Sequence, residues 1–539
     1  MSAPTAGVPE QRTPWFPLVV IVLAQLQMGV NVTVLPVSLG PISEDLGAPT
    51  TATATALLLY SLFVAAFVML GAKIGKIAGE RLVFQVTVVV HGLAMVLMAV
   101  APNAAAMNLA QAIAGIAAAV LVPTLVVLIA ANYHGRQQAT ALGVLAGMPA
   151  VASAVTFVGA GFLATALSWR YSYWLIVALA VVVLVLSFRL APVARRPVRI
   201  DVVGVVLSAA AIALILFGFN NLQRWGLLAA EPAAPFSVLR ISPAPLLVLV
   251  GVVFGQAFFA WSNRRVAARR QPLLALEVLA STEERSAVVA FLVAGSLSLA
   301  VSFLIPLYVQ IAQGRSPMAS AVVILPYAVS VAAAGVLSVR LYGRHAPRIL
   351  GVASFALIAV GLVVVAATLG TSWSTVGVIV GLLLVGVGEG TLLTLLFNVL
   401  VSASPKRLAG DVGALRGVAN NVSNALGAAF ASVVAVGLLG VFLGAAYTTS
   451  DLPPSVHDRA TTGGVGFVTD GELRTTLGAS VTPAQAEAAV AINADARLRA
   501  LRASFLVVGA ISLLAIFPAL RLPRYADDEL DADEIVGEA

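Results

Sequence analysis

Residues 54 to 101 read ATALLLYSLFVAAFVMLGAKIGKIAGERLVFQVTVVVHGLAMVLMAVA, and this stretch decides the fold. It contains two apolar runs, Ala54 to Ala72 and Leu82 to Ala101, each close to the roughly 20 residues that a helix needs to cross a membrane. The residues between the runs are basic and rich in glycine. Because hydrocarbon offers the backbone no hydrogen-bond partner, each run must form a helix. We therefore predict two transmembrane helices joined by a short basic turn.

Similar apolar runs recur along the whole chain. We predict transmembrane helices at Trp15 to Leu39, Ala54 to Ala72, Leu82 to Ala101, Ala106 to Ala131, Ala139 to Leu167, Tyr173 to Phe188, Val202 to Phe219, Ala244 to Trp261, Ala287 to Ile311, Ala319 to Val339, Ile349 to Leu369, Thr375 to Val401, Val412 to Phe442 and Ala503 to Leu520. The pattern is six helices, an inserted pair and six more, which makes fourteen spans in an all-α integral membrane protein.

The composition excludes several other classes of protein. Hydrophobic residues make up 60% of the 539 residues and charged residues only 10%, against roughly a quarter in soluble domains. The net charge of +7 comes from basic residues that lie between apolar runs rather than on one face, which argues against a nucleic-acid partner. There is no cysteine, and no catalytic triad or metal-ligand cluster is visible, so we expect neither an enzyme nor a cofactor.

The distribution of basic residues predicts the orientation in the membrane. With the N-terminus inside, 22 of the 31 Lys and Arg residues fall in cytoplasmic segments, as the positive-inside rule requires. Both termini are then cytoplasmic. The predicted segments are a tail at 1–14, a six-helix bundle at 15–190, a two-helix insert at 191–285, a second bundle at 286–525 with a long outer loop at 443–499, and an acidic tail at 526–539. Within the outer loop, Thr482 and Pro483 are typical of a helix start.

A second basic turn, Val339 to Arg348, repeats the first one in the later half, and duplicated halves are typical of secondary transporters. Over Trp15 to Leu522 the chain resembles the major facilitator superfamily, and within it the fourteen-helix drug:proton antiporter branch. The resemblance is carried by Asn31 to Thr33 with Ile42 to Ala48, the Gly71 to Arg81 turn, Gly115 to Pro123, Leu167 to Tyr171, Phe303 to Tyr308 and Pro405 to Gly410.

The resemblance implies two six-helix bundles that rock about a central cavity, with the extra pair at the side. It further implies a monomer in the cell membrane that exports small amphiphilic molecules, contacts membrane lipids and uses protons as the coupling ion. The turn matches the family's loop motif, and the gating candidates there are Gly71, Lys73, Gly75, Lys76, Gly79 and Arg81, to which we add Arg416.

Several positions depart from the family pattern. Family exporters usually carry Asp where this chain has Asn31, Asp where it has Lys76 and Arg where it has Gln111. Thr156 and Phe157 replace the Gly-Pro pair of the antiporter motif. An amide cannot take up and release a proton near neutral pH, so any proton coupling must use another group.

Glu389 is the one acidic residue that we place deep in a span, between Gly388 and Gly390. An ionised carboxylate in hydrocarbon costs roughly 3 kcal/mol, so this side chain should face a cavity, be paired or be protonated. We predict that it couples transport to protons or senses substrate. The alternative is a structural role, such as a pair with Arg416.

Polar and aromatic side chains on the predicted helices indicate a substrate cavity. The candidates are Gln27, Asn31, Gln111, Phe157, Tyr308, Tyr327, Asn420 and Asn424. Amides at such positions also serve as contacts between helices, so that interpretation stays open. Two other functions are compatible with the pattern: a protein that extracts or flips lipid, and a sensor on the same scaffold that does not transport.

Overall fold

The computed structural model describes residues 13–47, 50–195, 198–315, 317–341, 344–370, 376–450, 452–453, 467, 469–478 and 481–524. Its α-helices are α1 (Phe16–Val37), α2 (Leu39–Asp45), α3 (Thr50–Ala78), α4 (Glu80–Ala99), α5 (Ala104–Asn132), α6 (Gly135–Ala166), α7 (Arg170–Ser187), α8 (Val202–Trp225), α9 (Pro243–Ala267), α10 (Thr282–Leu307), α11 (Pro317–Leu337), α12 (Pro347–Thr368), α13 (Val376–Ser402), α14 (Ala409–Thr448), α16 (Asp470–Leu477), α17 (Pro483–Leu514) and α18 (Ile516–Ala519). Four short turns join them: η1 (Leu276–Leu279), η2 (Tyr308–Ala312), η3 (Ser338–Leu341) and η4 (Lys406–Leu408).

The all-α prediction is confirmed. Within the described ranges the chain forms no strand beyond isolated bridges in the connection between α8 and α9. Thirteen of the described helices are long and apolar enough to cross a membrane. The 32-residue α6 lies in the same bundle, between α1 and α11. The number of fourteen spans stays a prediction.

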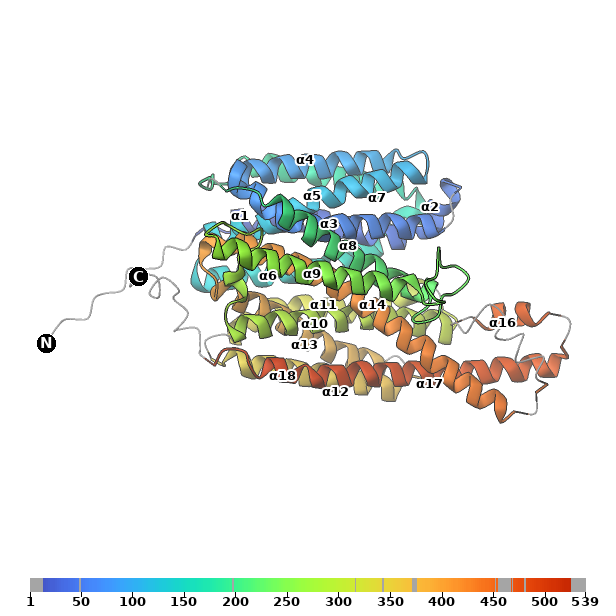
Figure 1. Cartoon of the computed structure of the whole chain (residues 1–539). Helices are drawn as coiled ribbons and strands as arrows, with labels where there is room; N and C mark the ends of the chain where they lie inside the picture. Colours follow the sequence, from blue (N-terminus) through green and yellow to red (C-terminus); the bar gives the residue numbers. More distant parts are fainter. Residues whose placement is uncertain are drawn as a thin grey trace.

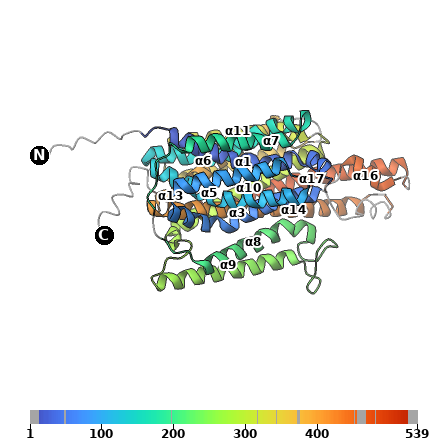
Figure 2. The same cartoon turned by 90° about the horizontal axis from the view of Figure 1, so that it is seen from above.

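The helices form two groups that lie one on the other (Figure 1). Helices α1 to α7 make up one half of the bundle, and α10 to α14 with α17 and α18 make up the other. The pair α8 and α9 lies at the side of the bundle, where α8 packs on α3 and α14 (Figure 2). Since α1 begins and α18 ends at the same end of the bundle, we call that end the termini side and the other end the opposite side.

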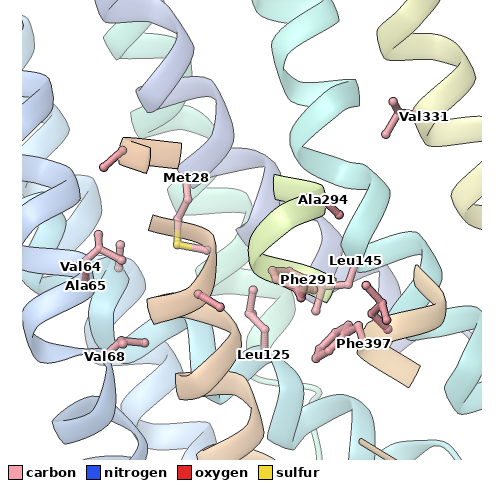
Figure 3. Packing of buried hydrophobic residues seen from close by; sticks show 14 of the residues in the cluster. Met28, Val64, Ala65, Val68, Leu125, Leu145, Phe291, Ala294, Val331 and Phe397 are labelled. Atoms are coloured by element: carbon pink, nitrogen blue, oxygen red, sulfur yellow. The ribbon is translucent and has the colours of Figure 1, made fainter. Parts of the chain in front are cut away.

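One continuous apolar core joins the two halves. It includes Met28, Leu125 and Leu145 of the first half together with Phe291 and Phe397 of the second (Figure 3). The contact between halves runs mainly through three helix pairings, α6 with α11, α14 with α3 and α14 with α5. Small residues let these helices approach closely, as is usual inside membranes. The halves are therefore packed against each other over these helices.

Two boundaries differ from the sequence prediction. The turn expected from Gly71 is helical, because α3 continues to Ala78 and only Gly79, with φ +96°, separates it from α4. No residue between 71 and 78 breaks a helix, and the lysines there have partners that keep them in the protein. Glycine is the residue that adopts a positive φ without strain, so the chain turns there.

The predicted outer loop at 443–499 is also largely helical where it is described. Helix α14 continues to Thr448 and α17 begins at Pro483. Thr482 caps α17 in a reciprocal pair with Gln485, which confirms the predicted helix start. At 40 residues α14 is roughly 60 Å long, about twice the hydrocarbon thickness, so α14 and α17 project on the opposite side with α16 beside them. The acidic tail and most of the predicted N-terminal tail lie outside the described residues.

Glycines around Glu389 bring α13 against two neighbouring helices. A Cβ built at Gly388 lies 2.7 Å from the carbonyl oxygen of Ser354 in α12, and one at Gly390 meets the carbonyl oxygen of Val331 in α11. Neither backbone oxygen can move without displacing its helix. These close approaches hold Glu389 at the junction of α11, α12 and α13.

We expect Gly388→Ala to destabilise the protein by about 1–3 kcal/mol, because the added methyl group overpacks a backbone contact. The measurement is the thermal unfolding midpoint of the purified protein in detergent. Gly437→Ala is the matched control, since nothing lies within 4 Å of its built Cβ. Equal midpoints for the two variants would contradict the close packing of α12 and α13.

Candidate functional site

A buried carboxylate joins the two halves on the termini side. Asp411, in the first turn of α14, accepts hydrogen bonds from Lys73 Nζ at 2.7 Å and from Lys76 Nζ at 2.5 Å. Both lysines lie on α3 in the other half, and the side chain of Asp411 is only 1% exposed. We call these three residues the latch. A buried charge needs compensating partners, and here they come from across the interface.

The connection between α9 and α10 also contacts Asp411 and the residues around it. The backbone N–H of Ala275 donates to Asp411 Oδ1 at 3.1 Å, and Arg407 donates to Glu277 at 2.6 Å across the neighbouring surface. The second pair is more than half exposed on both sides. Asp411 therefore accepts hydrogen bonds from three donors. One of them, the N–H of Ala275, belongs to the segment that joins the insert to the second half.

The remaining residues of the predicted loop motif shape the backbone around the latch. A Cβ at Gly71 would meet the backbone of α5, and one at Gly75 would meet the carboxylate of Glu80. Arg81 donates to the carbonyl oxygen of Phe188 at 2.5 Å, at the end of α7. The motif thus fixes α3 against α5 and α4 against α7, while its lysines reach the second half.

Two other stretches singled out in the sequence meet on the opposite side. Asp45, the last residue of α2, accepts from the indole N–H of Trp169 at 3.0 Å and pairs with Arg170 at 2.8 Å. Arg170 also donates to the carbonyl oxygen of Ala99 at the end of α4. These contacts lie within the first half, so they hold that half together as a unit.

Glu389 lies inside the second half and is 3% exposed. Tyr327 Oη donates to Glu389 Oε2 at 2.5 Å, and Ser298 Oγ lies 3.0 Å from Tyr327 Oη. This chain of three hydroxyl and carboxyl groups connects α10, α11 and α13. Arg416 is not its partner: the guanidinium lies 4.3 Å from the ring centroid of Phe397, and no ion pair to Glu389 occurs among the described residues.

The hydrogen-bond chain of Ser298, Tyr327 and Glu389 lies next to the contact between the halves. One residue after Glu389, Gly390 packs on α11, and a Cβ at Gly335 of α11 would lie 3.6 Å from the carbonyl oxygen of Gly390. On the other face, a Cβ at Gly143 of α6 would lie 2.9 Å from the carbonyl oxygen of Gly335. A change at Glu389 can therefore reach the first half through a single helix, α11.

The polar residues predicted on α1 pair within the first half. Asn31 and Gln111 exchange two amide hydrogen bonds of 3.0 Å, and Gln27 Nε2 lies 2.9 Å from His91 Nδ1. All four side chains are buried. The pairing joins α1 to α5 and to α4, and it uses neutral groups where the family usually carries charges.

The other cavity candidates are dispersed. Tyr308 is buried and donates to the carbonyl oxygen of Gly370 at 2.9 Å near the opposite side, away from Glu389. Asn420 is exposed although it lies on the interface helix α14, and Asn424 is half-buried one turn later. The side chain of Phe157 lies outside the described residues. The structure thus brings Tyr327 to Glu389 and Asn31 to Gln111 but does not gather the full set, and its role as a cavity stays a prediction.

The family model for the Major Facilitator Superfamily matches residues 21–428, from α1 into α14, which include nearly all of the first half, the inserted pair and helices α10 to α13 of the second half. The chain belongs to the major facilitator superfamily. It is a multi-pass protein of the cell membrane. A bundle of transmembrane helices in two halves, as described above, is typical of transporters of this kind.

Several relatives are exporters by name. The chain is 28% identical to the puromycin resistance protein pur8 of Streptomyces alboniger, over 80% of this chain and 83% of that protein. It is 26% identical to the multidrug efflux pump LfrA of Mycolicibacterium smegmatis, with the same coverage. The human organic anion transporter MFSD10 has a similar fold, with a TM-score of 0.56 and 15% identity over 95% of this chain and 100% of that one.

Sequence reasoning missed Asp411. It stands among loop residues before the predicted start of a span at Val412, so it does not attract notice as a buried acid. Charge complementarity was the signal that could have revealed Asp411. Lys76 replaces the family's loop acid, so the loop carries only basic residues at these positions and needs an acidic partner elsewhere in the chain. The partner is 335 residues away in the sequence, and only the packing of α3 on α14 identifies it.

We expect Asp411→Asn to separate the halves on the termini side, because Lys73 and Lys76 would then be buried without a counter-charge. Removing one partner of a buried pair costs about 3–5 kcal/mol. The chain has no cysteine, so spin labels at His134→Cys and His345→Cys, one exposed site on each half, report the separation by pulsed electron paramagnetic resonance.

The variant should shift the distance distribution to longer values. Glu277→Gln is the matched control, because it removes an exposed pair that contributes about 0–1 kcal/mol. An unchanged distribution in Asp411→Asn would show that the latch does not hold the two halves together.

Proposed function

We propose that this transporter exports small amphiphilic molecules from the cell by alternating access and that Glu389 carries the coupling proton. The observation that supports export is the similarity to drug-resistance exporters over about four fifths of the chain. Family likeness alone is an analogy. The arrangement of charged groups adds a physical argument for how such a cycle would work.

In this proposal the termini side is cytoplasmic, as the excess of basic residues there requires. The latch and the close contacts of α6 with α11 then hold the cytoplasmic side closed. To open that side, Asp411 must leave Lys73 and Lys76, and each charge must find water instead. Substrate binding or protonation has to supply the free energy difference between the two states.

The hydrogen-bond chain at Glu389 offers a way to supply it. While Glu389 is ionised it only accepts, so Tyr327 donates to it and Ser298 donates to Tyr327. Once protonated, Glu389 donates, and Tyr327 can turn its own proton toward Ser298. The donors along the chain thus reverse, and the buried charge disappears. Both changes act on α11, which contacts the first half through Gly335 and Gly143.

The substrate would bind between the halves along α14, where Asn420 is exposed and Asn424 is half-buried. An amphiphilic guest would gain about 25 cal/mol per Å² of apolar surface buried, with the amides orienting its polar part. We further propose that the protein works as a monomer, since each half of the cycle uses groups of one chain.

We expect cells that produce the protein to accumulate less ethidium, and to tolerate more puromycin, than cells that produce Asp411→Asn. The measurement is dye fluorescence during loading and efflux, at equal amounts of protein in the membrane. Glu277→Gln should behave like the wild type. If the wild type, the Asp411→Asn variant and empty cells accumulate the same amount of every amphiphile tested, export is wrong.

We expect Glu389→Gln to abolish transport driven by a pH gradient in proteoliposomes, because glutamine keeps the size and an acceptor but cannot exchange a proton. Tyr327→Phe should slow transport at least severalfold while leaving binding intact. Glu283→Gln, which changes an exposed carboxyl group in the first turn of α10, is the control. Glu389→Gln that still responds to the pH gradient would remove Glu389 from the coupling mechanism.

A further inference from the structure

A crevice opens between the two halves on the termini side, away from the latch. Its volume is about 520 Å³, and it is lined by Thr140, Val336, Leu337, Val339, Arg340 and Arg344. Thr140 lies near the start of α6 in the first half, and the other residues lie at the end of α11 and just after it. Gly143 and Gly335, which bring α6 and α11 into close contact, lie one turn or less along these helices from Thr140 and Val336.

The lining of the crevice carries positive charge, and no acidic side chain in the lining neutralises it. Arg340 and Arg344 are both exposed, and neither guanidinium has an ion pair in the described part of the chain. None of the six lining residues is acidic. Two arginines spaced four apart, with planar groups that suit phosphate oxygens, favour a doubly coordinated phosphate.

Two apolar residues of the crevice wall have exposed side chains near the end of a span. Val336 is 39% exposed and Leu337 is 52% exposed, and both precede the end of a span that runs to Leu341. The arginines therefore lie where a span meets the headgroup layer, and the exposed apolar side chains lie deeper. A ligand that matches both features has an anionic head and an apolar tail.

We propose that this crevice binds an anionic phospholipid, with its phosphate between Arg340 and Arg344 and an acyl chain along Val336 and Leu337. Basic pockets between transmembrane helices are known to hold anionic headgroups. A zwitterionic phospholipid would bring its own ammonium group to two uncompensated cations, so it fits less well. Because Thr140 of α6 lines the same crevice, a lipid bound there would also contact the first half.

The experiment measures binding of phosphatidylglycerol to the full-length protein in detergent, by native mass spectrometry and by the shift of the thermal unfolding midpoint. We expect phosphatidylglycerol to bind and to raise the midpoint, while phosphatidylcholine does so weakly. Arg340→Gln with Arg344→Gln should weaken phosphatidylglycerol binding by about thirtyfold, since each arginine near the headgroups contributes about a factor of five.

Two matched variants test the assignment. Arg269→Gln with Arg270→Gln removes two exposed charges from the same side of the protein outside the crevice, and it should bind phosphatidylglycerol like the wild type. Arg340→Lys with Arg344→Lys keeps the charge without the planar groups and should lose only a fraction of the affinity. Both pairs leave the latch and Glu389 untouched.

Three outcomes would overturn the proposal: equal binding by the wild type and the Arg340→Gln, Arg344→Gln variant, equal binding of phosphatidylcholine, or an equal midpoint shift with inorganic phosphate or glycerol 3-phosphate, which lack tails. The last outcome would identify a soluble anion as the ligand. The lipid site does not depend on export, because lipid binding is measured without any gradient or substrate.

Discussion

The carboxylate of Asp411 is the group on which the closed arrangement of this protein depends. A carboxylate that is almost completely removed from water needs opposite charges and hydrogen-bond donors in direct contact with it. For Asp411 these are Lys73, Lys76 and the N–H of Ala275. These donors belong to the opposite half and to the linker that follows the inserted pair. The chain cannot satisfy Asp411 without bringing α3, α14 and that linker together.

Polar groups inside the two halves are arranged differently. In the first half, Asn31 and Gln111 satisfy each other as neutral amides, so α1 and α5 are joined there without a charge. In the second half, Glu389 has a tyrosine donor and no cation partner among the described side chains. Of Asn31, Gln111, Tyr327 and Glu389, only the Glu389 carboxyl can exchange a proton near neutral pH, which is why the proposed coupling is assigned to it.

Much of the fold was predictable because membrane helices obey a local rule. Apolar length and the absence of water determine that a run such as Leu82 to Ala101 is a helix, whatever it packs on. The cap at Thr482 was predictable for the same reason, since a cap is a contact between close neighbours. The end of α3 was not predictable, because Lys73 and Lys76 are typical of a loop unless the chain supplies a buried acidic partner for them. Glu389 could be found as a lone acid, but its donor Tyr327 could not.

Sequence reasoning alone predicted the family, the all-α class and the one acid that lies deep in a span. These properties depend on composition and on order along the chain, and a membrane allows few alternatives. Only the tertiary structure decided which charges meet. Asp411 and Lys73 are 338 residues apart, and hydrogen bonds act over about 3 Å, so their pairing depends on how two helices from different halves happen to cross. The latch, the hydrogen-bond chain at Glu389 and the arginine crevice all follow from such crossings.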